Sequence, residues 1–360
     1  MTEGMSSKSM LKERTNGVVG VSPNVGTGKW HLWIGLVFSL GCLVLALRDV
    51  DLGKIVVALQ QVNLLIVALA AISNVVTILA KAARWRALLV LRKTPSLGQA
   101  FSVLSIGMLV NSFAPGRIGE LVRAFLLGES ESESKVYILS TIVVEKTTDL
   151  VFLMLSVALL LSQMALPDWL TGPARALAIT IVILIPVLLL LAWQSSVVLR
   201  AVGRISNLIA PAWQVWLVQK TGLGLEGLQI IQNPRVLFGL FTWSVLIWII
   251  SVLTNYLVFG AMGMVQSGWA ALLLLVVLQA GVAVPSSPGR IGVFQYLAVL
   301  ALGVFSIDKE LAFGYSVVLY IVVYVPIAIV GAYCLWRSRI TWQRLITAAT
   351  AVSRLLGEPK

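Results

Sequence analysis

Histidine, cysteine and charged residues are scarce in this chain of 360 residues. The one histidine, His31, argues against zinc hydrolases, histidine phosphatases and Ser-His-Asp hydrolases, whose sites need imidazoles. The two cysteines, Cys42 and Cys334, lie in apolar segments, so neither a disulfide framework nor a thiolate metal site is expected. Only 12% of the residues are charged, whereas soluble domains average about 25%. This shortage argues against an ordinary cytosolic enzyme.

The chain is rich in apolar residues. They make up 59% of the chain and form long uninterrupted runs, which are typical of a polytopic α-helical membrane protein. The formal net charge of +12 would suggest nucleic acid binding in a soluble protein, but here the basic residues flank the apolar runs. We therefore expect membrane lipids of anionic character as partners and no nucleic acid. We expect no cofactor and no metal ion.

The apolar runs predict an all-α fold with six full spans in one transmembrane domain, 31–336. A flexible tail over 1–30 precedes this domain and a basic tail over 337–360 follows it. Nineteen Lys and Arg residues fall on the side of both tails and four on the other side, so the positive-inside rule places both termini in the cytoplasm. The predicted spans are 32–47, 63–80, 136–163, 176–193, 234–262 and 311–336.

One pentapeptide occurs twice. The sequence PGRIG at 115–119 recurs at 288–292, at an offset of 173 residues. The same offset relates two repeat units, 63–163 and 236–336. A single span separates the units, so they are expected to enter the membrane from opposite sides. Inverted-topology repeats of this kind are common in secondary transporters.

Each pentapeptide interrupts an apolar stretch and is expected to form the tip of a helical hairpin. The arms are 97–114 with 116–127 in the first unit and 268–284 with 289–305 in the second. Broken helices are tolerated at membrane depth only inside protein or beside water. The arm 116–127 would be about 18 Å long, too short for a hydrocarbon core of about 30 Å. This favours re-entrant hairpins over hairpins that cross fully.

The hairpin tips predict an anion site. A helix that begins at a tip points its free N–H groups and about half a positive charge toward the tip, and Arg117 and Arg290 add whole charges. Two such tips that converge in the membrane suit an anion, most naturally a phosphate. The alternative is that the Pro-Gly pairs are packing kinks and the arginines extend to the interface. The predicted phosphate-binding residues are Arg117, Arg290, Gly116, Gly289, Asn111 and Ser287.

Charged residues inside the first unit predict a second feature. Glu145 and Asp149 lie four residues apart on one helix face near mid-membrane, where each charge costs about 2.5–3.5 kcal/mol. They need counter-ions, for which Arg117 or Arg123 is expected. A purely structural network and a proton- or substrate-coupling role are equally open. The predicted network is Glu120, Arg123, Glu145, Lys146 and Asp149, and Arg84, Trp85 and Arg86 are expected to form an anchor at the membrane interface.

Four segments carry a resemblance to a known family: RWRALL at 84–89, NSFAPGRIGELVR at 111–123, EKTTD at 145–149 and PSSPG at 285–289. They are similar to the transmembrane domain of lysylphosphatidylglycerol synthase, which is one of a broader group of flippase-like membrane proteins. In that family an Arg usually follows the Glu of the third segment, where this chain has Lys146. The second tip commonly reads Pro-Gly-Gly followed by an acid, where this chain has Arg290 and Gln295.

The resemblance covers about 30–340 and implies a domain that moves lipids across the bilayer. Only the 24 residues 337–360 follow the last predicted span, so the soluble aminoacyl-transferase domain of the full synthases is not expected. We predict a non-enzymatic flippase of the cell membrane for a phosphate-bearing phospholipid or a polyprenyl-phosphate-linked lipid. Two alternatives stay open: a membrane-embedded transferase with Glu145 and Asp149 as base and acid, and a scaffold for a separate lipid-modifying enzyme.

Overall fold

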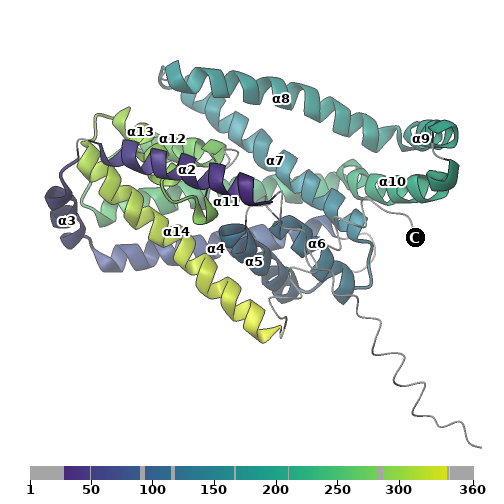
Figure 1. The fold of residues 1–360 in the computed structure, drawn as a ribbon, viewed down its shortest axis with the longest axis horizontal. Coiled ribbons are helices and arrows are strands. Elements are labelled where there is room, and N and C mark those ends of the chain that lie inside the picture. The colour runs from purple at the N-terminus through teal and green to yellow at the C-terminus, as the bar shows by residue number, and fades with distance from the viewer. Residues whose placement is uncertain are drawn as a thin grey trace, which may run out of the picture.

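The computed structural model describes residues 28–48, 50–89, 94–114, 118–165, 168–209, 211–281, 287–338 and 340. Within these ranges every regular element is a helix, which confirms the all-α prediction (Figure 1). Residues 115–117 of the first predicted tip and most of both predicted tails lie outside the described residues. The helices before the connecting region are α2 (Gly28–Leu47), α3 (Leu52–Gln60), α4 (Leu64–Leu88), α5 (Leu97–Phe113), α6 (Gly119–Ser130) and α7 (Lys135–Leu161). The others are α8 (Asp168–Trp193), α9 (Ser195–Ile209), α10 (Gln214–Gln229), α11 (Pro234–Ala261), α12 (Gly268–Gly281), α13 (Val293–Gly303) and α14 (Lys309–Arg337), with short 3-10 turns η2 (Pro211–Trp213), η3 (Ile230–Gln232) and η4 (Pro288–Arg290).

A helix covers each of the six predicted spans, and four of these helices are long and apolar enough to cross a membrane by themselves. They are α4, α8, α11 and α14, found among the described residues. Helix α7 has 27 residues but carries Glu145, Lys146 and Asp149 in its middle. The side chains of α8 are mostly exposed and apolar, as in Val182 and Leu190, which suits contact with lipid.

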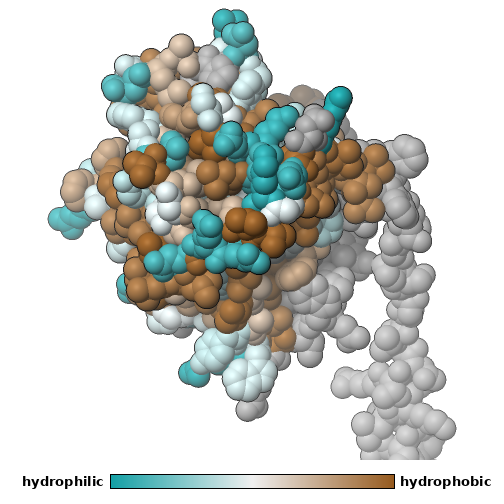
Figure 2. Space-filling model, turned by 90° about the vertical axis from the view of Figure 1, so that its left-hand side faces the viewer, coloured by the Kyte–Doolittle hydropathy of each residue, from teal (hydrophilic) through white to brown (hydrophobic). Residues whose placement is uncertain are grey.

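The surface has the polarity of a membrane protein. Figure 2 looks onto the end of the molecule where α3 lies, and it shows groups of hydrophilic residues across the middle and at the upper edge of this face, with hydrophobic residues over much of the lower part. Large hydrophobic side chains are exposed along the flanks of the molecule, among them Phe238 and Ile249 on α11 and Ile329 on α14. Soluble monomers rarely expose apolar patches on this scale.

Two series of four helices, α4–α7 and α11–α14, fall at the positions of the two predicted repeat units. Adding 173 to the bounds of α4 gives 237–261, and α11 is Pro234–Ala261. The same addition to α7 gives 308–334, and α14 is Lys309–Arg337. The packing is reciprocal as well, because α5 packs against α14 of the other unit and α12 packs against α7.

The equivalent helices α4 and α11 run antiparallel. At the start of α4 the Asn63 amide donates to the Ala261 carbonyl at the end of α11, 2.8 Å away. Further along, Ser73 and Thr254 share a hydrogen bond of 2.9 Å. Near the end of α4, Arg84 donates to Ser244 of α11 over 3.1 Å. Residue numbers rise along one helix as they fall along the other, so the two units are inverted with respect to each other.

The hairpin arms are short. Helices α5, α6, α12 and α13 have 17, 12, 14 and 11 residues, which corresponds to about 16–26 Å each. The last predicted arm, 289–305, begins as a helix only at Val293, because Gly289 and Gly292 have φ angles of 73° and 93° and Pro288–Arg290 forms the 3-10 turn η4. Gly292 also leaves room for a neighbour, since a Cβ there would overlap the Ser39 carbonyl oxygen of α2.

Candidate functional site: a cationic cavity beside a buried ion-pair network

A cavity of about 140 Å³ lies between α4 of the first unit and α11–α14 of the second. On α4 it is lined by Asn74, Thr77 and Lys81, which are spaced three and four residues apart and so share one helix face. The wall opposite includes Gln279 at the end of α12 and Arg290 at the tip between α12 and α13. The cavity is therefore built where the two units meet.

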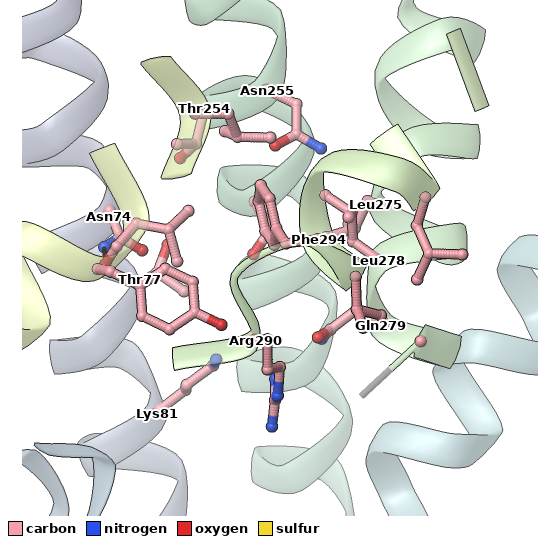
Figure 3. A pocket seen from close by; sticks show the side chains of 17 residues that line it. Asn74, Thr77, Lys81, Thr254, Asn255, Leu275, Leu278, Gln279, Arg290 and Phe294 are labelled. Carbon is pink, nitrogen blue, oxygen red and sulfur yellow. Dashed lines mark hydrogen bonds between the residues drawn. The ribbon is translucent and has the colours of Figure 1, made fainter. Parts of the chain in front are cut away.

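Lys81 and Arg290 make one end of this cavity cationic. Figure 3 shows their side chains at the same end, below Thr77 and Gln279. No carboxylate is among the lining residues. Among the described residues, neither cation has a carboxylate oxygen within 4.0 Å. Two positive charges without a carboxylate partner in a partly buried cavity suit an anion.

The tip that presents Arg290 is held in an unusual backbone conformation. Arg290 itself has a φ of 57°, in the left-handed region that is costly for residues with a side chain. The Arg290 amide donates to the Ser287 carbonyl over 2.9 Å. From α14, the Tyr320 hydroxyl donates to the Gly289 carbonyl over 2.9 Å, and its ring stacks on that of Tyr324, which lines the cavity. These contacts fix the position from which Arg290 reaches the cavity.

The other predicted phosphate-binding residues lie in different places. Ser287 donates its amide to Ser39 of α2 over 2.7 Å and does not line the cavity. Asn111 accepts from the Gly119 amide at 2.7 Å and donates to Glu120 at 3.0 Å, so it ties α5 to the start of α6. The carbonyl of Gly289 faces Tyr320, and Gly116 and Arg117 lie outside the described residues.

The second tip lies against the first hairpin. Turn η4 packs on α5, and a Cβ added to Gly289 would lie 3.9 Å from the carbonyl oxygen of Ser112. Ser112 is close to the end of α5, immediately before the first tip. The amide of Gly292, at the start of α13, already donates to Gln295 over 2.7 Å. The start of α13 therefore has one fewer free N–H group for a ligand.

Beside the cavity, six charged side chains of the first unit form an ion-pair network. Its centre is Glu145, only 2% exposed, which pairs with Arg123 at 2.7 Å and with Arg84 at 3.5 Å. Arg84 is fully buried and also pairs with Asp149 at 2.8 Å. Arg123 is one of the two counter-ions of Glu145 that the sequence leads us to expect.

The outer part of the network is more exposed. Lys146 lies 3.8 Å from Glu120 and 3.9 Å from Asp149. With Arg84 and Arg123, the network contains three cations and three carboxylates, so its formal charge is zero. The network joins α4, α6 and α7, and so fixes the first hairpin against the rest of its unit.

Arg84 and Trp85 do not lie at an interface with water. Both are fully buried, the guanidinium of Arg123 lies 4.2 Å from the centre of the Trp85 ring, and the Trp85 indole N–H donates to Thr141 over 3.4 Å. Arg86 alone of the three expected anchor residues is exposed, and it donates to the Pro95 carbonyl over 2.9 Å. The packing of α4 against α11 and α5, together with the contacts that Arg84 and Trp85 make to α7, explains the burial.

Sequence reasoning missed Lys81 as a cavity residue and Arg84 as a network residue. A signal for both was present. Asn74, Thr77, Lys81 and Arg84 recur at intervals of three and four residues within an apolar stretch, which places them on one face of α4. A polar face that begins inside the predicted span 63–80 and continues past its end points toward other protein or toward a polar cavity rather than toward lipid.

The antiparallel repeat, the apolar flanks and the buried charges define an integral membrane protein. A family model described as the lysylphosphatidylglycerol synthase TM region matches residues 32–331. The chain therefore belongs to this family, as its motifs predicted. Comparison with curated proteins and with solved structures yields no match.

Proposed function

We propose that this protein moves a phosphate-bearing anionic lipid, a phospholipid or a polyprenyl-phosphate-linked lipid, between the leaflets of the cell membrane. The observation that carries the proposal is the cavity between the inverted units, with Lys81 and Arg290 at one end and no lining carboxylate. A lipid phosphate neutralises both cations, which otherwise stay partly buried without a counter-ion.

The architecture supports movement of the bound headgroup. Hairpin arms of about 16–26 Å favour re-entry from one face of a core of about 30 Å. Inverted units with a site at their interface are the arrangement in which alternating access arises by rocking one unit against the other. We place both termini in the cytoplasm, from the distribution of Lys and Arg.

The transferase alternative receives less support from the geometry. It assigns acid and base roles to Glu145 and Asp149, but both carboxylates pair with Arg84 and neither lines the cavity. A carboxylate held in an ion pair inside the protein is a poor proton acceptor. The contacts of both residues favour a structural role that shapes the wall beside Lys81.

Lipid scrambling tests the proposal. Purified protein in liposomes is supplied with a tail-labelled anionic phospholipid, and dithionite bleaching measures its movement. Replacing Lys81 and Arg290 together by Gln should lower the rate by at least about tenfold, because each lost charge-assisted contact contributes roughly 1.5–3 kcal/mol.

The matched control is Arg235→Gln, which removes an exposed cation at the start of α11. It should leave the rate unchanged. A folded double variant that scrambles the lipid as fast as the unaltered protein would overturn the proposal.

A further inference from the structure

The two ends of the cavity differ in what they offer to a ligand. Figure 3 shows Lys81 and Arg290 at one end and Thr254 and Asn255 at the other, with Asn74 and Thr77 on the α4 wall between them. Lysine and arginine side chains can only donate hydrogen bonds. The cationic end therefore supplies donors together with positive charge, and it fits a phosphate.

Two asparagines, Asn255 at the other end and Asn74 on the α4 wall, present acceptors. The side-chain amide nitrogen of Asn255 donates to the Ala271 carbonyl over 3.1 Å. That of Asn74 donates to the carbonyls of Val322 and Val323 over 3.3 and 3.0 Å. Carbonyl partners require the nitrogen on that side, so the amide oxygens of Asn74 and Asn255 remain as acceptors. Among the described residues, no donor contacts either oxygen.

Two hydroxyl groups that line the cavity, those of Ser251 and Thr77, are also acceptors. Ser251 donates to the Ile247 carbonyl over 2.7 Å, and Thr77 donates to the Ser73 carbonyl over 3.1 Å. Each hydroxyl hydrogen is used within its own helix, and the oxygen is left with lone pairs. The walls that α4 and α11 contribute to the cavity are thus rich in acceptors, and these acceptors are neutral.

We propose that the cavity recognises a phosphate ester that carries hydroxyl groups and no amine, such as a polyol or sugar phosphate headgroup. The phosphate lies at Lys81 and Arg290, and the hydroxyl groups donate to acceptors such as Asn255 and Ser251. An ammonium group is disfavoured because no carboxylate lines the cavity to compensate its charge and two cations repel it. The inference rests on the proposed function for its lipid source and specifies the headgroup.

Binding distinguishes the headgroup classes without requiring transport. Thermal unfolding of the purified full chain in neutral detergent is followed with three short-chain lipids. These are phosphatidylglycerol, phosphatidylethanol, which has the same charge but no hydroxyl group, and phosphatidylethanolamine. We expect phosphatidylglycerol to bind roughly fivefold more tightly than phosphatidylethanol for each hydroxyl bonded, and phosphatidylethanolamine to bind most weakly. Equal binding of the two anionic lipids, or tighter binding of the amine lipid, would overturn the inference.

Variants assign the preference to the cavity. Ser251→Ala and Asn255→Leu should each reduce the preference for phosphatidylglycerol and leave the affinity for phosphatidylethanol unchanged. Ser251→Ala loses only a hydrogen bond within its own helix, so this variant is expected to fold and can test the preference even if Asn255→Leu does not fold. The control is Thr242→Ala, an exposed residue of the same helix whose hydroxyl donates to the Phe238 carbonyl in the same way. A full preference that persists in both cavity variants contradicts the assignment.

Two further measurements separate this inference from the proposed function. Lipid scrambling without any preference for hydroxylated headgroups would refute the inference and leave the flippase proposal standing. Selective binding of phosphatidylglycerol without scrambling would refute the flippase proposal and leave the inference about the headgroup standing. Glycerol 3-phosphate tests the source, because binding as tight as that of the lipid would retain the headgroup chemistry and overturn a lipid as the ligand.

Discussion

Glu145 forms ion pairs with two arginines that are themselves buried. The network therefore depends on Glu145 more than on its other members. Arg123 has Glu145 as its only carboxylate partner within 4.0 Å among the described residues, whereas Arg84 also has Asp149. A buried pair loses little when both charges are replaced together, but removing one partner leaves the other charge uncompensated.

Glu145→Gln should therefore destabilise the protein strongly. Breaking a buried ion pair costs about 3–5 kcal/mol, which we expect to lower the Tm in detergent by roughly 5–10 °C. The control is Asp168→Asn, which removes an exposed carboxylate at the start of α8 and should change the Tm little. A similar Tm for both variants would contradict the role assigned to Glu145.

At the scale of single residues, the sequence was sufficient for part of the network. Glu145 and Asp149 fall four apart inside an apolar stretch, and a charge in such a place requires a partner, of which Arg123 was one expected choice. Arg84 was missed as a partner, because its neighbours Trp85 and Arg86 suggested an interfacial anchor, although its spacing along α4 carried a signal. Its burial follows from the packing of α4 between α7 and α11, which no local pattern encodes.

Among the elements, the second hairpin depends on close packing at its tip. Gly292 combines a φ of 93° with a neighbour, Ser39 of α2, whose carbonyl oxygen occupies the place of a Cβ. The sequence predicted the hairpin, but not that α13 begins only at Val293 or that α2 covers this point. Both depend on backbone angles and on a helix from outside the repeat.

Gly292→Ala should loosen the contact between α2 and α13. A side chain in this backbone conformation costs on the order of 1–3 kcal/mol, and the clash with Ser39 adds to this cost, so a lower Tm is expected. Gly303→Ala, at the other end of α13, is the matched control, because a Cβ there meets nothing within 4 Å. Equal Tm values for the two variants would show that α2 does not pack as described.

For the molecule as a whole, the sequence predicted the repeat but not the cavity. An exact pentapeptide at a fixed offset is visible in one chain, and the offset relates the helix bounds of both units. The cavity walls come from α4 of one unit and α11–α14 of the other. Which faces meet across two units is decided by long-range packing, to which hydropathy and spacing are blind.

Inverted topology makes a direct prediction for labelling from outside intact cells. Gln61 and Gln232 are exposed, and each lies just before the first helix of its unit. In a chain with Cys42 and Cys334 replaced by Ala, Gln61→Cys should react with a membrane-impermeant maleimide. Gln232→Cys should react only after permeabilisation. Reaction of both positions from the same side would contradict insertion of the units in opposite orientations.

The ion-pair network also limits how alike the two units are. At the offset of 173, Glu145, Lys146 and Asp149 correspond to Val318, Leu319 and Val322, which are buried apolar residues of α14. At these positions the first unit is thus stabilised by electrostatic contacts and the second unit by dispersion and hydrophobic burial. If the halves exchanged conformations, the resulting state would differ in energy from the first. The population of each state would then change with conditions that weaken ion pairs, and it would change independently with conditions that weaken apolar packing.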